Sequence, residues 1–117
     1  MDERILGLAS RLGQTIAESK AAKALQATRQ AVDADKDLQQ VMRDYRLQAD
    51  KIRQLEQETK PIEPDDKRAL EAMNQKLAAS EKFKALTAAQ MEYVDLLRKV
   101  NQAVQKELAS TEAPGKQ

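Results

Sequence analysis

The segment ETKPIEPDDKR, residues 58–68, divides a chain whose other parts are rich in helix-forming residues. Pro61 and Pro64 fit poorly inside a helix, because proline lacks an amide hydrogen and clashes with the preceding turn. Pro64 followed by two aspartates is a favourable helix start, since proline suits the first position and carboxylates suit the positive end of the helix dipole. A break of this kind between two helical stretches predicts a hairpin of helices.

Apolar residues recur at steps of three and four along the rest of the chain, which places them on one face of each successive helix. The stripes consist of Ile5, Leu8, Ala9, Leu12 and Ile16, then Leu38, Val41, Tyr45, Ile52 and Leu55, then Leu70, Met73 and Leu77, and finally Phe83, Leu86, Tyr93, Leu97, Val100, Val104 and Leu108. Gln48 takes a polar position within the second stripe and is expected to help set its register. Gly13, in the first helical segment, predicts close packing against a neighbour.

The pattern predicts an all-α fold, an elongated antiparallel helical hairpin or bundle of about four to five helices. Residues 1–109 are expected to form a single helical domain. Residues 110–117, STEAPGKQ, lack periodicity and are expected to form a flexible C-terminal tail. A single hairpin of long helices leaves one side of its apolar stripes uncovered, so the fold is expected to form dimers or larger oligomers.

Cysteine and histidine are both absent from the 117 residues. Zinc, iron–sulfur and haem sites normally draw ligands from these two residue types, so no metal or cofactor is expected. Nucleophilic catalysis by Cys–His or Ser–His–Asp groups cannot be assembled within one subunit. We therefore predict no catalytic, cofactor-binding or metal-binding residues, no small-molecule substrate and no enzymatic activity.

The charges of the chain nearly cancel, with 20 Lys and Arg against 19 Asp and Glu. This balance argues against strong electrostatic attraction to nucleic acid or to an anionic membrane. The N-terminal MDERILGLAS lacks the apolar run of a secretory signal, and no other run reaches membrane-spanning length. The sequence thus predicts a cytoplasmic protein that binds neither nucleic acid nor membrane directly.

One phrase occurs twice in similar form, as IAESKAAKALQA from Ile16 and as LAASEKFKALTA from Leu77. Its serines, Ser19 and Ser80, could act as nucleophiles or phosphosites, but no histidine is present to activate either hydroxyl. A serine hydroxyl also accepts backbone N–H groups at the start of a helix. We interpret both serines as caps at the joints between helices, and either Asp33 or Asp35 as the cap of the helix between them.

All the aromatic residues and three methionines fall on predicted apolar faces. We interpret the aromatic residues as core packing rather than as base-stacking platforms, and the methionines as gap fillers in the core. These residues are Tyr45, Phe83, Tyr93, Met42, Met73 and Met91.

From about Asp2 to Leu108, the chain resembles the YlbF/YmcA family of small bacterial regulators, in which YheA-like members are included. The resemblance is one of helical pattern and helix-end residues, set about the proline-containing break. The matching positions are Leu12, Gly13, Ile16, Ser19, Leu25, Ala27, Asp35, Leu38, Tyr45 and Leu55 before the break, and Phe83, Leu86, Tyr93, Leu97, Val100 and Asn101 after it.

The resemblance implies an all-helical, dimer-forming protein without enzymatic activity. In the family, YlbF and YmcA join YaaT in a complex that modulates ribonuclease Y and influences competence, sporulation and biofilm formation. That complex is associated with iron–sulfur clusters. Here the sequence departs from the family, because a chain without cysteine supplies no thiolate ligand.

The apolar stripes and the resemblance together predict a regulatory adaptor that acts through protein–protein contacts, and the resemblance implies an RNA-processing complex of the ribonuclease Y type as its target. The expected partners are proteins: a second copy in a homodimer, a larger oligomer, or related regulators in a hetero-complex. A small helical holdase-type chaperone, which would grip clients between helical arms, is the alternative.

Overall fold

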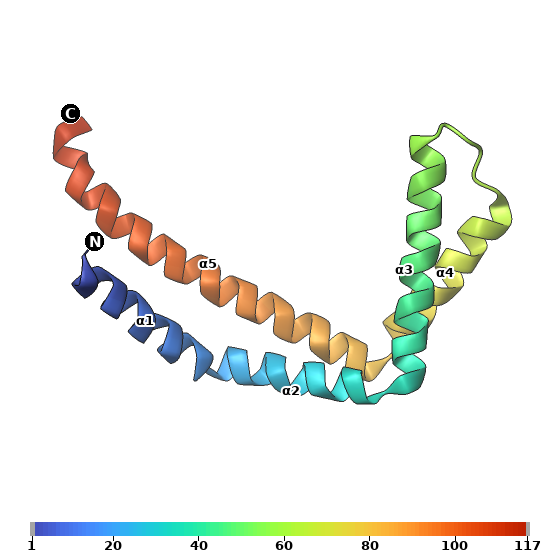
Figure 1. The fold of residues 1–117 in the computed structure, drawn as a ribbon, viewed down its shortest axis with the longest axis horizontal. Helices are drawn as coiled ribbons and strands as arrows, with labels where there is room; N and C mark the ends of the chain where they lie inside the picture. Colours follow the sequence, from blue (N-terminus) through green and yellow to red (C-terminus); the bar gives the residue numbers. More distant parts are fainter. Residues whose placement is uncertain (1, 117) are drawn as a thin grey trace. The chain divides into compact units, whose positions relative to one another are not determined.

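The computed structural model describes residues 2–116, with side-chain surroundings described as far as residue 111. In this range the chain forms α1 (Glu3–Ala17), α2 (Lys20–Ala34), α3 (Lys36–Gln57), α4 (Pro64–Ala79) and α5 (Glu81–Lys116), as Figure 1 shows. The predicted all-α class is confirmed, and the number of helices in this range lies within the predicted four to five.

The backbone divides into two compact units, which are described separately below. Unit 1 comprises Met1–Gln26 and Ala88–Gln117, and unit 2 comprises Ala27–Thr87. The helices α2 and α5 each contribute to both units. The predicted single domain over residues 1–109 does not follow this division and stays a prediction.

The last helix extends further than the sequence pattern indicates. We expected a tail from residue 110, whereas α5 continues to Lys116. Helical hydrogen bonding is local and does not require an apolar stripe, so a helix can continue past its last packed residue. The predicted flexibility of residues 110–117 stays a prediction.

The joints between helices are closed by the predicted caps. The Ser19 hydroxyl accepts the amide of Ala22 at 3.1 Å at the start of α2, and the Ser80 hydroxyl accepts the amide of Phe83 at 3.2 Å at the start of α5. Of the two aspartates considered for α3, Asp35 is the cap, since its carboxylate accepts the amide of Leu38 at 3.0 Å. The doubled phrase therefore marks two helix starts.

The break between α3 and α4 begins with a left-handed residue. The amide of Lys60 donates to the carbonyl of Leu55 at 2.9 Å, and the amide of Thr59 donates to that of Glu56 at 3.1 Å. These two bonds form a Schellman motif, which places the residue after the C-cap in the left-handed region. That residue is Thr59, at φ 54°, where a β-branched side chain is strained.

Replacing Thr59 by glycine is therefore expected to stabilise the hairpin. The gain in unfolding free energy should be about 0.5–1 kcal/mol, after allowance for the extra backbone entropy that glycine loses on folding. Urea unfolding followed by circular dichroism would measure it. Thr59→Ala is the control, because alanine keeps the Cβ atom; an equal gain with alanine would show that the left-handed backbone is not the cause.

Few of the apolar side chains that the structure describes are buried. In unit 1 these are Leu25 and Ala89, and in unit 2 they are Val32, Leu38, Leu77 and Leu86. Val32 is the most deeply buried of them, at 2% exposure. Its carbonyl accepts the side-chain amide of Gln39 at 3.0 Å, which ties the end of α2 to the first turns of α3. Unit 2 thus holds most of the described core.

A polar cluster fixes α3 against the start of α4. Gln48, the polar residue in the second apolar stripe, donates to the backbone carbonyl of Asp66 at 2.9 Å and lies 3.5 Å from its carboxylate. Lys51 donates to the same carboxylate at 2.8 Å. The side chain of Asp66 is only 14% exposed, whereas that of Lys51 is 58% exposed, so water reaches the ion pair from the lysine side. Gln48 therefore helps to set the register between α3 and α4.

The Lys51 ammonium, together with Gln48, holds the pKa of Asp66 below its ordinary value of 3.8. The pKa is lower in the folded chain than in the unfolded one, so the stabilisation is present above the unfolded pKa and is lost as the pH falls through the folded pKa. Asp35 shifts in the same direction, because it accepts the Leu38 amide and pairs with Lys82 at 3.3 Å.

We expect the unfolding free energy of the chain to decrease as the pH is lowered below about 4, and Asp66→Asn to remove part of that dependence. Urea titrations at pH 7 and pH 3 would measure the difference. Asp65→Asn provides the control, because the neighbouring Asp65 side chain is 92% exposed. An identical pH dependence for the wild type and Asp66→Asn would contradict the prediction.

Candidate interaction surfaces

The chemistry of the described side chains offers no metal or cluster site. No group of three or more His, Cys, Asp or Glu side chains is arranged to hold a metal ion within residues 2–111. The iron–sulfur cluster implied by the family resemblance does not fit this chain, because the sequence contains neither cysteine nor histidine. The candidate functional features are instead apolar surfaces.

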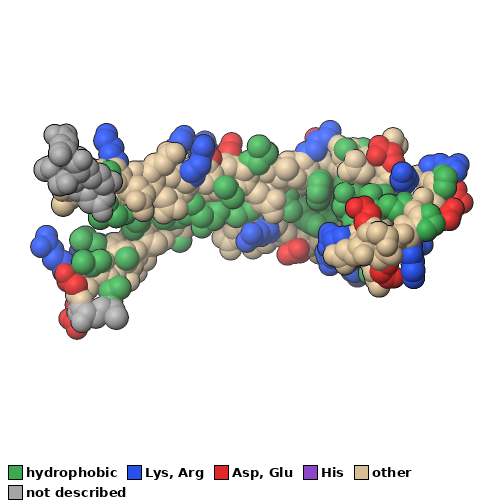
Figure 2. All heavy atoms as spheres, turned by 90° about the horizontal axis from the view of Figure 1, so that it is seen from above, with side chains coloured by type: hydrophobic (Ala, Val, Ile, Leu, Met, Phe, Trp, Pro, Cys, Tyr) green, Lys and Arg blue, Asp and Glu red, His purple; other side chains and the backbone are tan. Residues whose placement is uncertain are grey.

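The first such surface lies on α1, where none of the described residues is buried. Ile5, Leu8 and Leu12 follow one another at helical spacing and are 63%, 56% and 40% exposed. Figure 2 shows hydrophobic side chains at the surface along this helix. A soluble helix normally turns such a stripe towards a core. Of the predicted apolar stripes, that of α1 is the one without a buried residue.

The second surface lies on the part of α5 that belongs to unit 1. It includes two exposed apolar pairs at helical spacing, Met91 with Val94 and Val104 with Leu108, which are 68%, 62%, 46% and 51% exposed in that order. The gap-filling role expected for Met91 is therefore wrong, because its side chain projects into solvent. We refer to the exposed apolar residues of α1 and of this part of α5 as the unit 1 faces.

Gly13 does not have the close neighbour that its position in the sequence predicts. A Cβ atom added at Gly13 would meet no other atom within 4 Å, and the same is true of Gly7. Packing within the described chain therefore does not explain either glycine. Both glycines remain available for close approach by another molecule.

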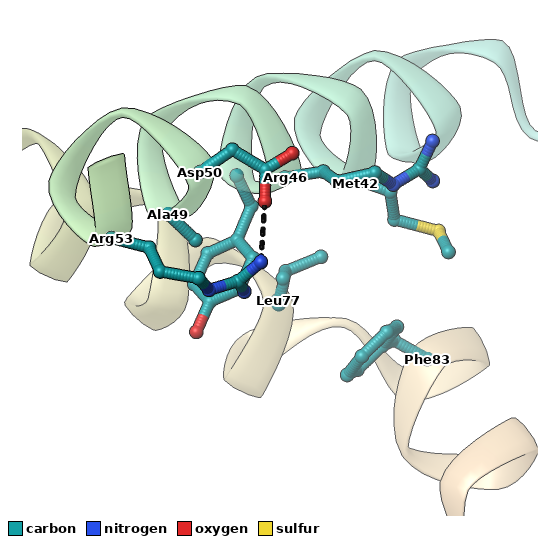
Figure 3. A pocket seen from close by; sticks show the side chains of 8 residues that line it. Met42, Arg46, Ala49, Asp50, Arg53, Leu77 and Phe83 are labelled. Atoms are coloured by element: carbon teal, nitrogen blue, oxygen red, sulfur yellow. Dashed lines mark hydrogen bonds and ion pairs between the residues drawn. The ribbon is translucent and has the colours of Figure 1, made fainter. Parts of the chain in front are cut away.

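Unit 2 contains a pocket between α3, α4 and the start of α5, shown in Figure 3. Its volume is about 340 Å³, near the lower end of the range of roughly 300–1,000 Å³ for small-molecule pockets. The helix α3 contributes most of the lining, and Leu77 and Phe83 point towards α3 from the other two helices. The residues that α3 contributes are Met42, Tyr45, Arg46, Ala49, Asp50 and Arg53.

The pocket has an apolar floor and a charged rim. Asp50 and Arg53 form an ion pair at 3.1 Å on the rim, drawn as a dashed line in Figure 3. Arg46 is exposed and makes no hydrogen bond or ion pair with any other residue that the structure describes. Of the three charged side chains that line the pocket, Arg46 is thus the one without a direct partner among the described residues.

Sequence reasoning missed this pocket. Tyr45, Phe83 and Met42 were expected to fill the core, but all three are only half-buried and line the open pocket. Their helical spacing correctly indicated an apolar face. Whether a facing helix covers that face depends on residues more than thirty positions away, and the periodicity of a single helix carries no information about them.

The order and capping of the helices can be compared with known proteins. A family model described as "Control of competence regulator ComK, YlbF/YmcA" matches residues 5–109. The chain belongs to the YlbF/YmcA family. The fold is shared with a chain from the X-ray crystal structure of Bacillus subtilis RicA in complex with RicF, with a TM-score of 0.79. The match covers 97% of this chain and 98% of that chain, and the sequence identity is 18%. A search of curated proteins found no significant match.

The structure also bears on membrane insertion. Across the residues that it describes, no helix combines the length and the apolar character needed to cross a bilayer.

Proposed function

We propose that this YlbF/YmcA-family chain is a non-enzymatic regulatory adaptor that acts through protein–protein contacts. The observation that carries the proposal is the exposure of the unit 1 faces, with Ile5 at 63% and Leu108 at 51%. Covering apolar surface contributes roughly 25 cal/mol per Å², so a partner that buries these faces gains binding energy without any catalytic group. A solved structure with the same fold is a complex of RicA with RicF, which supports a protein partner for this chain as well.

The proposal includes self-association. A homodimer, or a hetero-complex with a related regulator, would let one apolar helical stripe cover another, as helices in bundles do. The open space around Gly7 and Gly13 is compatible with close approach of a partner helix to α1. A cytoplasmic location also stays part of the proposal.

Native mass measurement of the purified chain at micromolar concentration would test it. We expect the purified chain to form a homodimer or a larger oligomer. If it does not, we expect it to form a stable complex when it is co-expressed with related regulators of the same cell. A strict monomer that forms no complex with any of them would contradict the adaptor function.

We propose further that the adaptor modulates an RNA-processing complex of the ribonuclease Y type. Only the family resemblance supports this more specific role. Its test is the pattern of ribonuclease Y cleavage products in wild-type cells and in cells lacking this chain. Unchanged transcript processing would remove this part and leave the adaptor function in place. We expect the chain itself to bind no RNA, because its net charge is only +1.

A holdase-type chaperone is the second candidate, favoured by the same exposed apolar side chains on α1 and α5. A holdase would suppress the aggregation of unrelated unfolded proteins at near-stoichiometric ratios. An adaptor would not do so, and the two functions are thereby distinguished by a light-scattering assay with a heat-denatured client.

A further inference from the structure

We propose that the pocket of unit 2 is a docking site for an acidic amphipathic helix of a partner protein, which inserts apolar side chains beside Tyr45 and Phe83 and places a carboxylate against Arg46. This inference rests on the proposed adaptor function and assigns it a second surface, separate from the unit 1 faces. The pocket is lined from three helices of one unit and is open to solvent.

The geometry favours a helix as the occupant. The lining residues of α3 run from Met42 to Arg53, a distance of about 16 Å along the helix at 1.5 Å per residue. A partner helix of three turns makes contact over the same length. Ala49 lies in the middle of this row, between bulkier side chains, and its small size leaves room for a partner side chain to approach the backbone of α3.

The charges favour an acidic occupant. Arg53 already has a carboxylate partner in Asp50, whereas Arg46 has none within the described chain. An arginine beside an apolar floor can pair with a carboxylate through two parallel hydrogen bonds, and that contact strengthens when the surrounding water is displaced. Helix-in-groove recognition uses this combination, with apolar anchors at helical spacing and charged residues at their edge.

The test uses the full-length chain with ¹³C-labelled methionine methyl groups. The probe is a synthetic helical peptide of about 14 residues, with leucines at helical spacing and glutamates beside them, long enough for the three turns of the groove. Met42 lines the pocket, whereas Met91 is 68% exposed on the unit 1 faces and serves as an internal reference. We expect the peptide to shift the Met42 signal and leave the Met91 signal unchanged.

Substitutions test the role of the charge. Arg46→Glu should weaken binding of the acidic peptide at least about tenfold, and a peptide with lysine in place of glutamate should recover the affinity. Arg43→Glu is the matched control, because Arg43 is exposed on the same helix outside the pocket lining, and it should change the affinity less than about twofold. Ala49→Phe should fill the pocket and abolish binding, with folding verified by circular dichroism.

Three outcomes would overturn the assignment of the pocket as a helix-docking site. A shift of Met91 without Met42 would place the peptide on the unit 1 faces, which leaves the adaptor function standing and removes the pocket from it. Tighter binding of decanoate than of the peptide would identify a site for a lipid-like anion. No shift of Met42 with peptide at millimolar concentration would show that the pocket is not a helix-docking site. The oligomer measurement described above remains independent of all three.

Discussion

Leu77→Ala is expected to lower the free energy of unfolding by about 2–4 kcal/mol, the usual cost of deleting a buried leucine side chain. Leu77 is 5% exposed and lies on α4, where it packs towards α3 and forms part of the pocket floor. Its loss would leave a cavity at the contact that joins the two helices of the hairpin. Urea unfolding at a fixed protein concentration would measure the change, because self-association also contributes to apparent stability.

Leu47→Ala is the matched control for Leu77→Ala. It deletes the same atoms from α3, but Leu47 is 68% exposed, so the expected change is below about 0.5 kcal/mol. Equal losses for the two variants would contradict the packing described for unit 2. A larger loss for Leu47 would instead indicate that a second molecule covers that side of α3.

The double substitution Ile5→Glu with Leu12→Glu is expected to weaken association of the chain at least about 100-fold. Complete burial of one large aliphatic side chain contributes about 1.5–3 kcal/mol, of which only the exposed part of Ile5 and of Leu12 counts here. Each substitution also places a carboxylate that must lose its water, and the two costs together exceed the roughly 2.8 kcal/mol that corresponds to 100-fold. The fold of the monomer should be unaffected, because both side chains are already solvent-exposed, at 63% and 40%. Sedimentation analysis over a range of concentrations would measure the dissociation constant.

A control with the same change of charge is available on the opposite side of α1. Ser10→Glu with Gln14→Glu also adds two carboxylates, and both positions are exposed and polar. This variant should associate within about threefold of the wild type, because charges away from an interface act only at long range and are screened by salt. If both double variants lose association equally, net charge rather than the apolar stripe of α1 is responsible.

The helix ends were predictable because their causes are local. Ser19, Ser80 and Asp35 cap helices through side-chain atoms that reach only two or three residues along the chain. Pro64 begins α4 for an equally local reason, since its ring removes a donor that the first helical turn does not use. The strained left-handed residue, Thr59, was not predictable, because nothing in its type favours that conformation.

The apolar surfaces were predictable only in part. The stripe of α1 and that of α3 follow the same helical spacing, yet Leu38 on α3 is 6% exposed and Ile5 on α1 is 63% exposed. Periodicity indicates which side of a helix is apolar, but burial depends on what another part of the chain places against that side. For the same reason the helical spacing of Met42 and Tyr45 predicts a place in the core, although both line an open pocket.

The sequence by itself determined the all-α class, the helix starts, the absence of thiolate and imidazole chemistry, and the family. These follow from residue type and from interactions within a few positions, which act in the same way wherever the helix lies. Tertiary structure alone decided which stripes are covered, that Gln48 fixes α3 to Asp66, and that Arg46, at the rim of the pocket, has no partner among the described residues. Each of these features depends on residues that are far apart in the chain, and only the packing of the helices decides which side chains come together.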